Sequence, residues 1–489
     1  MRGSGMFRQI VGYVPSTVIP AVVSFLMIYV YTRLLTPAAY GSFSLVFSAI
    51  LVVQTSLFFA IPMALTRFYP EALAQDRQEG FLSTCYSFFY GFSALLVLMV
   101  GIVSVFIMPR DPVLWGLSVL VLLARSAVVL NQSVNRISFA VGRFTVIECT
   151  HAILGLGLGT LFIHWLGASA EAVVLGLLIS ALVCMAIDFH LLLTPFRFGW
   201  RKIERVTLAT LVRFSLPLIV VDITVCLLTL SDRFLLNKLG GVEALGIYTV
   251  AYSLVERPIT LICIAITTAT FPIAVHVMHE KGRDAGGRQL GQNAAILLAL
   301  AIPACVGLAF TAPQMAAVMV GADFRDGVAA LIPILCVVAL LRGCSIHIID
   351  HAFQLAGRTS LAIWAYGPAA AANIILNFVL IPRYGVFGAA WAGLACQAIA
   401  VVVGWGLSRR VFPITLPVID IMKVIVAVCP MAVLLKQVAF SPTWAGLSQS
   451  VVSGALVFAV SAAVLNVGGV TVALLKRCAS RFQDAATRY

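Results

Sequence analysis

The stretch FSLPLIVVDITVCLLTLSDRFLLNKLGGVEALGIYTVAYSL, Phe214–Leu254, decides the fold class. It holds an apolar run over residues 214–237, a short turn at Gly240 and Gly241, and the start of a second apolar run. A helix rises about 1.5 Å per residue, and the hydrocarbon core of a bilayer is about 30 Å thick. Each run is therefore long enough to cross a membrane, and the stretch predicts two consecutive membrane-spanning helices.

The same pattern extends over the whole chain. The 489 residues are 61% hydrophobic and only 10% charged, whereas soluble domains have about 25% charged residues. The composition therefore predicts an all-α, polytopic membrane protein without a large soluble domain. Fourteen spans are expected, at residues 11–32, 42–64, 81–107, 113–134, 144–165, 171–193, 214–237, 244–275, 293–311, 328–351, 360–381, 386–407, 421–438 and 448–467.

Internal similarity predicts two related lobes. TRLLTPAAYGSFSLVFSA (Thr32–Ala49) resembles DRFLLNKLGGVEALGIYTVAYS (Asp232–Ser253), since each has an arginine, a turn, and a glycine followed two residues later by an aromatic residue. Repeats of this kind are typical of transporters. We expect an N-terminal lobe of six spans at residues 1–200, an amphipathic cytoplasmic linker at 201–213, a second six-span lobe at 214–408, and two further spans with a basic tail at 409–489.

The distribution of basic residues predicts the orientation. An even number of spans puts both termini on one side. With the termini cytoplasmic, 22 of the 32 Lys and Arg residues fall in cytoplasmic segments, six fall outside and four lie within spans. Positive charge is retained on the cytoplasmic side of membranes. The formal net charge of +13 therefore indicates topology, and we expect no nucleic-acid partner.

The sequence predicts neither a metal site nor a cofactor. The eleven cysteines are scattered without a CxxC pair, so we expect no disulfide and no cysteine-bound metal. His347 and His351 in HIIDH stand four residues apart, but without further ligands they favour a solvated or protonatable cluster over a zinc site. No nucleophile elbow or phosphate-binding loop occurs, and GLGLG (155–159) indicates helix packing. We expect a protein that is not an enzyme.

Three hairpin motifs resemble a known family. They are YTRLLTPAAYGSFSL (31–45), SDRFLLNKLGGVEALGIYTVAYSL (231–254) and NIILNFVLIPRYGVFGAAWAGL (373–394). They are similar to the polysaccharide-transporter branch of the multidrug/oligosaccharidyl-lipid/polysaccharide exporter superfamily, the bacterial O-antigen, capsule and exopolysaccharide flippases. The resemblance implies two six-helix lobes around a central cavity that opens alternately to each side. It also implies a substrate oligosaccharide on undecaprenyl diphosphate, moved from the cytoplasmic to the periplasmic leaflet of the inner membrane.

Charged residues inside the spans are the candidate site. A charge at the bilayer centre costs about 2.5–3.5 kcal/mol on insertion scales, so such residues face a protein interior or a wet cavity. Asp222 and Arg233 lie within roughly 20° of one helix face, which predicts a polar strip towards the cavity. The alternative for Arg233 is that it reaches the membrane surface from the helix end. The in-span charges are Arg125, Arg233, Arg257, Arg342, Glu148, Asp188, Asp222, Asp232, Glu256 and Asp350.

The basic members are expected to bind the substrate. Arginine stays charged and offers a planar fork for phosphate oxygens, so a diphosphate crossing a cavity needs such groups. The predicted substrate contacts are Arg125, Arg257, Arg342, Arg233 and, as an entry contact at the cytoplasmic end of the second span, Arg67. The alternatives are structural ion pairs for the first four and a topological anchor for the last.

The acidic members are candidates for ion coupling. The chain has no ATPase motif, so energy has to come from an ion gradient, the membrane potential or consumption of the product. The candidates are Asp222, Glu256, Asp350 and Glu148.

Three other functions stay open. A cation-coupled drug exporter of the same superfamily is disfavoured, because mid-span arginines repel cationic drugs. A membrane glycosyltransferase or polymerase needs a large periplasmic loop, and the longest outer connection is residues 312–327. A peptidoglycan-precursor flippase has the same chemistry with a different sugar. The expected partners are the lipid-linked oligosaccharide, the bilayer, and a polysaccharide polymerase with other assembly proteins, around a monomeric flippase.

Overall fold

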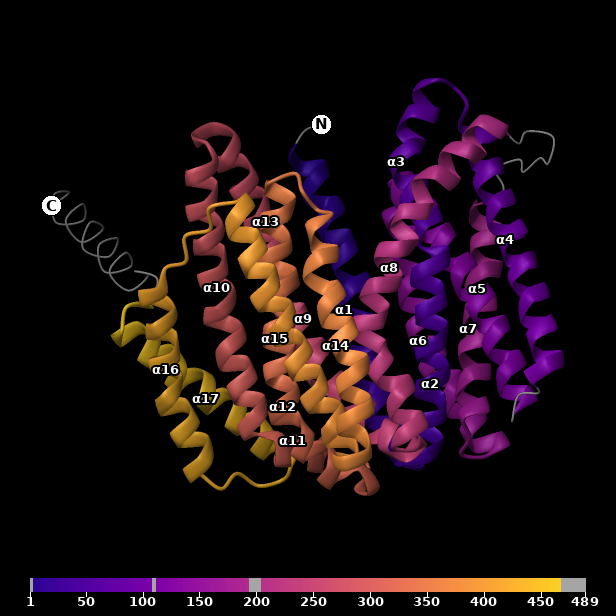
Figure 1. Ribbon diagram of the computed structural model, residues 1–489. Coiled ribbons are helices and arrows are strands. Elements are labelled where there is room, and N and C mark those ends of the chain that lie inside the picture. Colours follow the sequence, from indigo (N-terminus) through magenta and orange to yellow (C-terminus); the bar gives the residue numbers. More distant parts are fainter. Residues whose placement is uncertain (1–2, 108–110, 193–203, 468–489) are drawn as a thin grey trace, which may run out of the picture. The chain divides into compact units, whose positions relative to one another are not determined.

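The computed structural model describes residues 3–107, 111–192 and 204–467, and within them the chain is helical without strands (Figure 1). The first half contains α1 (Gly3–Leu34), α2 (Pro37–Val53), η1 (Gln54–Phe58), α3 (Ala60–Ala74), α4 (Gln78–Ile107), α5 (Pro112–Ile137), α6 (Val141–Leu166), α7 (Ala170–Leu192) and α8 (Arg205–Leu239). The second half contains α9 (Val242–Lys281), α10 (Arg283–Phe310), α11 (Ala312–Met319), η3 (Ala322–Phe324), α12 (Arg325–Cys344), η4 (Ser345–Ile349), α13 (Asp350–Leu355), α14 (Leu361–Tyr384), α15 (Val386–Val411), α16 (Val418–Gln437) and α17 (Trp444–Val464).

The predicted fourteen spans are confirmed. Within the described ranges, fourteen helical stretches are long and apolar enough to cross a membrane, and each overlaps one predicted span. Two spans are interrupted by a π-helix: η1 joins α2 to α3, and η4 joins α12 to α13. Many large apolar side chains on these helices are exposed, as expected for surfaces that face lipid.

Local sequence explains where several spans begin. Thr36 precedes Pro37, and its side chain accepts a hydrogen bond from the backbone N–H of Ala39 at 3.2 Å. Asp111 precedes Pro112 in the same way and accepts from the N–H of Leu114 at 3.0 Å. This hydrogen bond lowers the pKa of Asp111 below its ordinary value. Such caps satisfy N–H groups that have no partner within the helix, and proline suits the first helical position.

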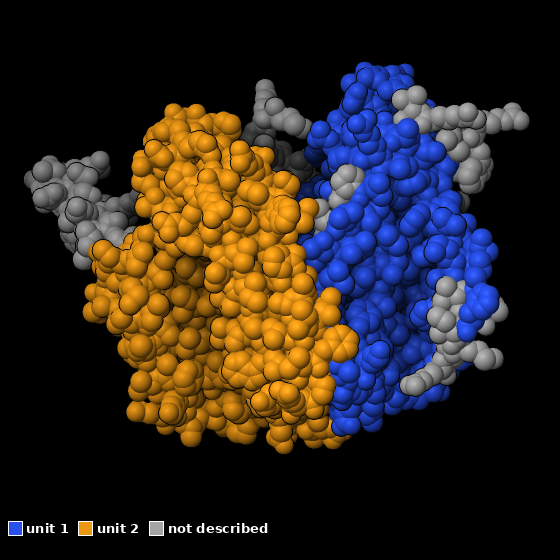
Figure 2. Space-filling view, viewed as in Figure 1, with its two compact units in different colours: residues 1–246 blue, residues 247–489 orange. Residues whose placement is uncertain are grey.

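The chain forms two compact units, residues 1–246 and 247–489, shown in blue and orange in Figure 2. In unit 1, α6 packs on α7 and α1, α5 packs on α7, and α8 contacts α2, α3 and α4. In unit 2, α14 packs on α15, α12 on α15 and α10, and α16 on α10 and α17. The described part of the predicted linker, residues 204–213, forms the N-cap and first turns of α8, and residues 201–203 lie outside the described ranges.

The unit boundary differs from the predicted lobe boundary. Contacts group α8 with unit 1, whereas the order of spans assigned residues 214–408 to the second lobe. The lobe division at residues 200 and 214, and the basic tail beyond residue 467, stay predictions.

Candidate functional site

Arg125 lies on α5 inside unit 1. Its guanidinium carbon stands 5.0 Å from the centre of the Phe47 ring of α2, a cation–π distance. Glu148 and His151, both on α6, act electrostatically on the same arginine. The side chain is half-buried, so its charge is held by an aromatic face and by an acid on a neighbouring helix.

Arg233 lies on α8 and is buried, with 9% of its surface exposed. Its Nη1 donates a hydrogen bond to Oγ of Ser48 on α2 at 3.1 Å. On the same helix, Cys226 lies against Thr55 and Ser56 of η1, with Sγ–Oγ distances of 3.2 and 3.6 Å. Arg233 and Cys226 of α8 therefore pack on α2 and η1, respectively.

Two predicted arginines converge on consecutive residues of α2. Arg125 stacks on Phe47, and Arg233 binds Ser48. Asp222, the predicted companion of Arg233 on α8, is half-buried. This places two guanidinium groups, which can bind phosphate oxygens, on two sides of one helix.

Arg342 and Glu256 form an ion pair in unit 2. Nη1 of Arg342 on α12 lies 3.2 Å from Oε1 of Glu256 on α9, and the two side chains are 25% and 20% exposed. Arg342 also contacts the hydroxyl of Tyr252, and Thr260 donates to Oε1 of Glu256 at 3.1 Å. The structure thus pairs a predicted substrate contact with a predicted coupling acid.

Asp350 lies at the end of η4, next to the two histidines of the HIIDH motif. Its Oδ2 accepts a hydrogen bond from the hydroxyl of Tyr366 on α14 at 2.7 Å, and its Oδ1 is buried without a hydrogen-bond partner. Nδ1 of His347 lies 3.1 Å from Oγ1 of Thr267, and the ring of His351 stacks on that of Phe271 at 4.2 Å. No group of three His, Cys, Asp or Glu side chains with the spacing of a metal site occurs in the described part of the chain.

Two further arginines were predicted as substrate contacts. Arg257 follows Glu256 on α9 and is half-buried. Arg67 on α3 is exposed, with its guanidinium 5.8 Å from the centre of the Phe68 ring. Their roles as substrate contacts stay predictions.

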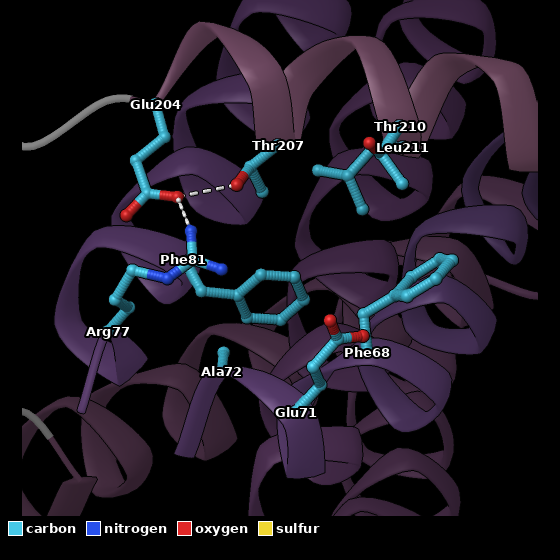
Figure 3. A pocket seen from close by; sticks show the side chains of 9 residues that line it. All are labelled: Phe68, Glu71, Ala72, Arg77, Phe81, Glu204, Thr207, Thr210 and Leu211. Atoms are coloured by element: carbon cyan, nitrogen blue, oxygen red, sulfur yellow. Dashed lines mark hydrogen bonds and ion pairs between the residues drawn. The ribbon is translucent and has the colours of Figure 1, made fainter. Parts of the chain in front are cut away.

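A small cavity of about 190 Å³ opens between α3, α4 and the start of α8. Figure 3 shows Phe68 and Phe81 on its wall, with Arg77 and Glu204 on one side. Nη1 of Arg77 lies 3.0 Å from Oε2 of Glu204. Binding sites for small molecules typically have about 300–1,000 Å³, so this cavity is too small for an oligosaccharide.

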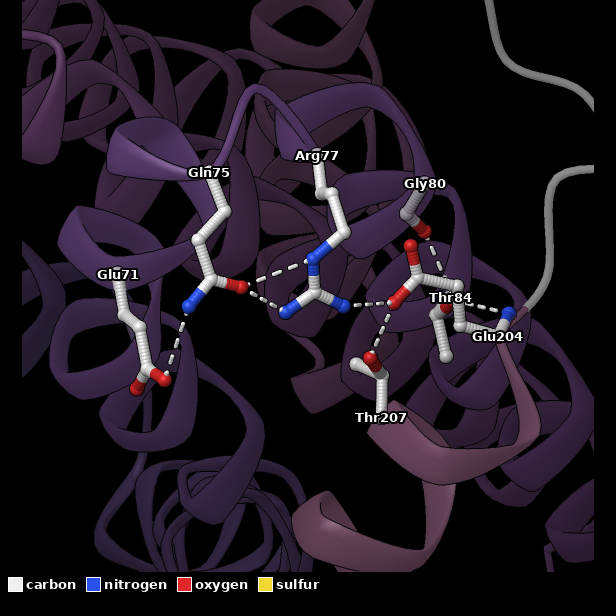
Figure 4. A network of polar contacts seen from close by, with 7 residues as sticks. All are labelled: Glu71, Gln75, Arg77, Gly80, Thr84, Glu204 and Thr207. Carbon is white, nitrogen blue, oxygen red and sulfur yellow. Dashed lines mark hydrogen bonds and ion pairs between the residues drawn. The ribbon is translucent and has the colours of Figure 1, made fainter.

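The polar network beside this cavity fastens α8 to the α3–α4 turn (Figure 4). Glu204 accepts from Arg77 and from Oγ1 of Thr207 at 2.6 Å, and its backbone N–H donates to Oγ1 of Thr84 at 3.0 Å. Gln75 in turn accepts from Nε of Arg77 at 3.0 Å. Arg77 is one of the basic residues of the predicted cytoplasmic segments, and its partner Glu204 lies 127 positions further along the chain, so this pairing cannot be read from the sequence.

Unit 2 contains a larger groove, of about 740 Å³, between α10, α16 and α17. Its lining is mainly apolar and includes Ile296, Leu300, Val424 and Phe458, with Asp420 as its acidic residue. The volume lies within the range of small-molecule sites. An apolar groove of this kind suits a hydrocarbon chain.

Two buried amides of unit 1 were not among the predicted site residues. Gln132 and Asn135 on α5 are 3% and 0% exposed and connect Glu148 with Asp188 by hydrogen bonds. Asp188 was recognised as an in-span charge but not as a site residue. The available signal was the sequence NQSVN, residues 131–135, which puts three amides at the end of an apolar span.

Comparisons with known proteins agree with this architecture. A family model described as "Polysaccharide biosynthesis protein" matches residues 30–329. The chain is similar to the solved structure of the lipid II flippase MurJ in an inward closed conformation, with a TM-score of 0.76, 14% identity, and coverage of 94% of this chain and 99% of that one. No curated protein sequence matches the chain.

Two other solved structures show a more distant likeness. An inward-facing multidrug resistance MATE family transporter of the MOP superfamily matches with a TM-score of 0.58 and 16% identity, over 81% of this chain and 98% of that one. A MOP superfamily transporter from Pyrococcus furiosus matches with a TM-score of 0.53 and 15% identity, over 82% and 94%. At these identities the likeness concerns the fold.

Proposed function

This chain belongs to the polysaccharide biosynthesis protein family, and we propose that it is a flippase for lipid-linked oligosaccharides. It moves an oligosaccharide on undecaprenyl diphosphate from the cytoplasmic to the periplasmic leaflet of the bacterial inner membrane, by alternating access. Both termini are cytoplasmic. A polysaccharide polymerase and other assembly proteins receive the product, and the flippase works as a monomer.

The observation that carries this proposal is the set of guanidinium groups held inside apolar helices. Arg125 and Arg233 lie on two sides of α2, and Arg342 lies on α12 of unit 2. Removing a diphosphate from water without a partner is costly, and hydrogen bonds from arginine to phosphate offset that cost. Each of these arginines has a partner within the protein. When the diphosphate arrives, the arginine exchanges that contact for a hydrogen bond to a phosphate oxygen.

The apolar groove of unit 2 provides a place for the lipid part. Its walls on α10, α16 and α17 carry aliphatic side chains and Phe458. Burial of apolar surface contributes about 25 cal/mol per Å², so a polyprenyl chain gains by lying along it. The polar headgroup and the lipid chain then have separate binding surfaces of opposite character, which matches an amphipathic substrate.

The similarity to MATE transporters leaves a drug exporter as the second candidate. The fold alone does not separate the two functions. A cationic drug is disfavoured by the mid-span arginines, because like charges repel at close range. The arginines therefore favour an anionic substrate over a cationic one.

The test compares arginine variants in reconstituted vesicles. Undecaprenyl diphosphate carrying a short fluorescent oligosaccharide is placed in both leaflets, and a membrane-impermeant quencher reports its translocation. Arg125→Ala is expected to slow translocation about tenfold or more, because a hydrogen bond to a charged group contributes about 1.5–3 kcal/mol. Arg125→Lys is expected to recover only part of the rate, since lysine lacks the planar fork.

Arg383→Ala is the matched control. Arg383 is an exposed arginine in the last turn of α14, so its removal takes away the same charge without touching the interior. Normal translocation by Arg125→Ala at equal protein level would contradict a substrate role of this arginine. Transport of cationic dyes, with no movement of the lipid-linked probe by the unaltered protein, would favour the drug exporter.

A further inference from the structure

A fully buried carboxyl group lies near the end of α7. Asp188 is 0% exposed and forms no ion pair with any residue in the described ranges. Its Oδ1 accepts one hydrogen bond, from Nδ2 of Asn135 at 3.3 Å, and its Oδ2 has no hydrogen-bond partner. Burying an ionised carboxylate with so little compensation costs several kcal/mol. The surroundings of Asp188 therefore favour its neutral form.

The amide of Asn135 continues into a chain of hydrogen bonds. Its Nδ2 also donates to Oε1 of Gln132 at 3.0 Å. Nε2 of Gln132 donates to the carbonyl oxygen of Phe144 at 3.0 Å and to Oε1 of Glu148 at 3.1 Å. A primary amide has two protons, so both amides have used all their donors. The chain connects the buried Asp188 with the half-buried Glu148.

Two buried acceptor atoms in this chain lack a donor: Oδ2 of Asp188 and Oδ1 of Asn135. Asn135 cannot donate to Oδ2, because both protons of its amide are used. A proton on Oδ2 would turn one acceptor into a donor. A neutral carboxyl group and a primary amide can then form two parallel hydrogen bonds, N–H···O and O–H···O, whereas an ionised carboxylate can form only one.

We propose that Asp188 is a proton-binding site, in which Asn135 holds the neutral acid and Gln132 connects it to Glu148. Binding forms one O–H bond on Oδ2 of Asp188, and release returns that proton to water. The polar groups that act on the acid from other helices are Asn131 on α5, Tyr86 on α4 and Arg143 on α6.

Of these neighbours, Asn131 and Tyr86 are neutral, and Arg143 carries a positive charge. The Asn131 amide lies near the Asp188 carboxyl, and its own oxygen accepts a hydrogen bond from the hydroxyl of Tyr86 at 2.7 Å. Cys184, one turn away on α7, is fully buried. Arg143 is exposed on the first turn of α6, so it can compensate the carboxylate when the proton leaves.

At the other end of the amide chain, Glu148 has Arg125 as its charged neighbour. Arg125 is a proposed substrate contact, so the proton site is connected to the substrate path through Gln132 and Glu148. The use of the proton to drive or regulate translocation rests on the proposed function. The binding of the proton itself does not.

A proton fits this site better than a metal cation does. Hard metal ions bind six or more oxygen atoms, many of them from water or carboxylates. Here two oxygen atoms lack partners, and both belong to side chains with no exposed surface. A proton needs only one donor–acceptor pair and no room for hydration.

The first experiment measures the proton directly. Infrared spectra of the full protein in nanodiscs at mildly acidic pH are expected to show the C=O band of a protonated carboxyl group that Asp188→Asn loses. Asparagine can form the same two parallel hydrogen bonds with Asn135, so this variant keeps the fold. Asp323→Asn, at an exposed position, is the control and should keep the band. A spectrum of Asp188→Asn identical to that of the unaltered protein would overturn the proposal.

The second experiment separates proton binding from its use. An imposed pH gradient is expected to stimulate translocation by the unaltered protein and by Asp323→Asn, but not by Asp188→Asn. Stimulation by a sodium gradient, lost in Asp188→Asn, would overturn the proton assignment in favour of a metal cation. Absence of any translocation by the unaltered protein would contradict the proposed function, and the infrared band would still decide proton binding.

Discussion

At the scale of single residues, two of the charged groups within spans of unit 2 have partners on other helices. Glu256 pairs with Arg342, 86 positions further along the chain, and Asp350 accepts from Tyr366 on α14. A buried pair contributes little net stability, yet removing one partner is costly, because the other is left buried and uncompensated. The loss of stability after removal of one partner therefore distinguishes an interior ion pair from an exposed one.

Replacing Glu256 by Gln is expected to lower the thermal unfolding midpoint by a few degrees. The reason is that Arg342 loses a charged partner, and hydrogen bonds between charged groups contribute about 1.5–3 kcal/mol. The double variant Glu256→Gln with Arg342→Gln should recover part of the loss. The measurement is thermal unfolding in nanodiscs, followed by intrinsic fluorescence.

The exposed pair of His276 and Glu280 provides the control. Its Nε2–Oε1 distance is 3.2 Å, and the side chains are 69% and 55% exposed. Exposed ion pairs contribute about 0–1 kcal/mol, so Glu280→Gln should leave the midpoint unchanged. An equal loss in both single variants would contradict the interior role of Glu256.

At the scale of elements, two glycines allow the first turns of α2 and α9 to touch at the backbone. A Cβ added at Gly41 would lie 1.9 Å from the carbonyl oxygen of Val242, and one added at Gly246 would lie 2.1 Å from that of Pro37. These are the two glycines that the internal similarity placed in equivalent positions. Small residues that permit close helix approach are typical of membrane proteins.

Gly41→Ala and Gly246→Ala are each expected to reduce the yield of folded protein and its unfolding midpoint, because backbone atoms cannot move aside as a flexible side chain can. Gly116→Ala on α5 is the matched control, since nothing lies within 4 Å of an added Cβ there. In a helix, alanine is favoured over glycine by about 0.5–1 kcal/mol, so this control should be at least as stable as the unaltered protein. Normal stability of both test variants would mean that the two turns can separate at little cost.

At the scale of the whole molecule, the excess of basic residues in alternate connections predicts the orientation of the fourteen spans. Predicted cytoplasmic connections carry most of the basic residues, and the helices confirm the number of spans on which that assignment depends. The orientation itself stays a prediction, because it concerns the membrane and not the packing of the chain.

Cysteine labelling tests this orientation. In a cysteine-free protein, Ala168→Cys is expected to react with an impermeant thiol reagent added outside, and Thr359→Cys only after the membrane is opened. Both positions are exposed in short connections between spans, so access to the reagent depends on the side of the membrane. Labelling of Thr359→Cys from outside in intact cells would contradict the cytoplasmic placement of the termini.

The sequence by itself determined the all-α class, the fourteen spans and the family resemblance, which the family match confirms. Span length and hydropathy are local properties, and so is a turn with glycine or proline, so they can be read without knowledge of neighbours. The in-span charges were also evident, because each is rare and costly in an apolar segment.

Only the tertiary structure decided which groups meet. Glu256 forms an ion pair with Arg342, which lies 86 positions further along the chain on another helix, and that pairing cannot be read from the sequence. The amides Asn135 and Gln132 were overlooked, because a neutral side chain has no charge signal and acquires its role only through Asp188 and Glu148 on adjacent helices. The physical reason is that hydropathy acts on each helix separately, whereas hydrogen bonds and close backbone contacts depend on how helices far apart in the sequence pack together.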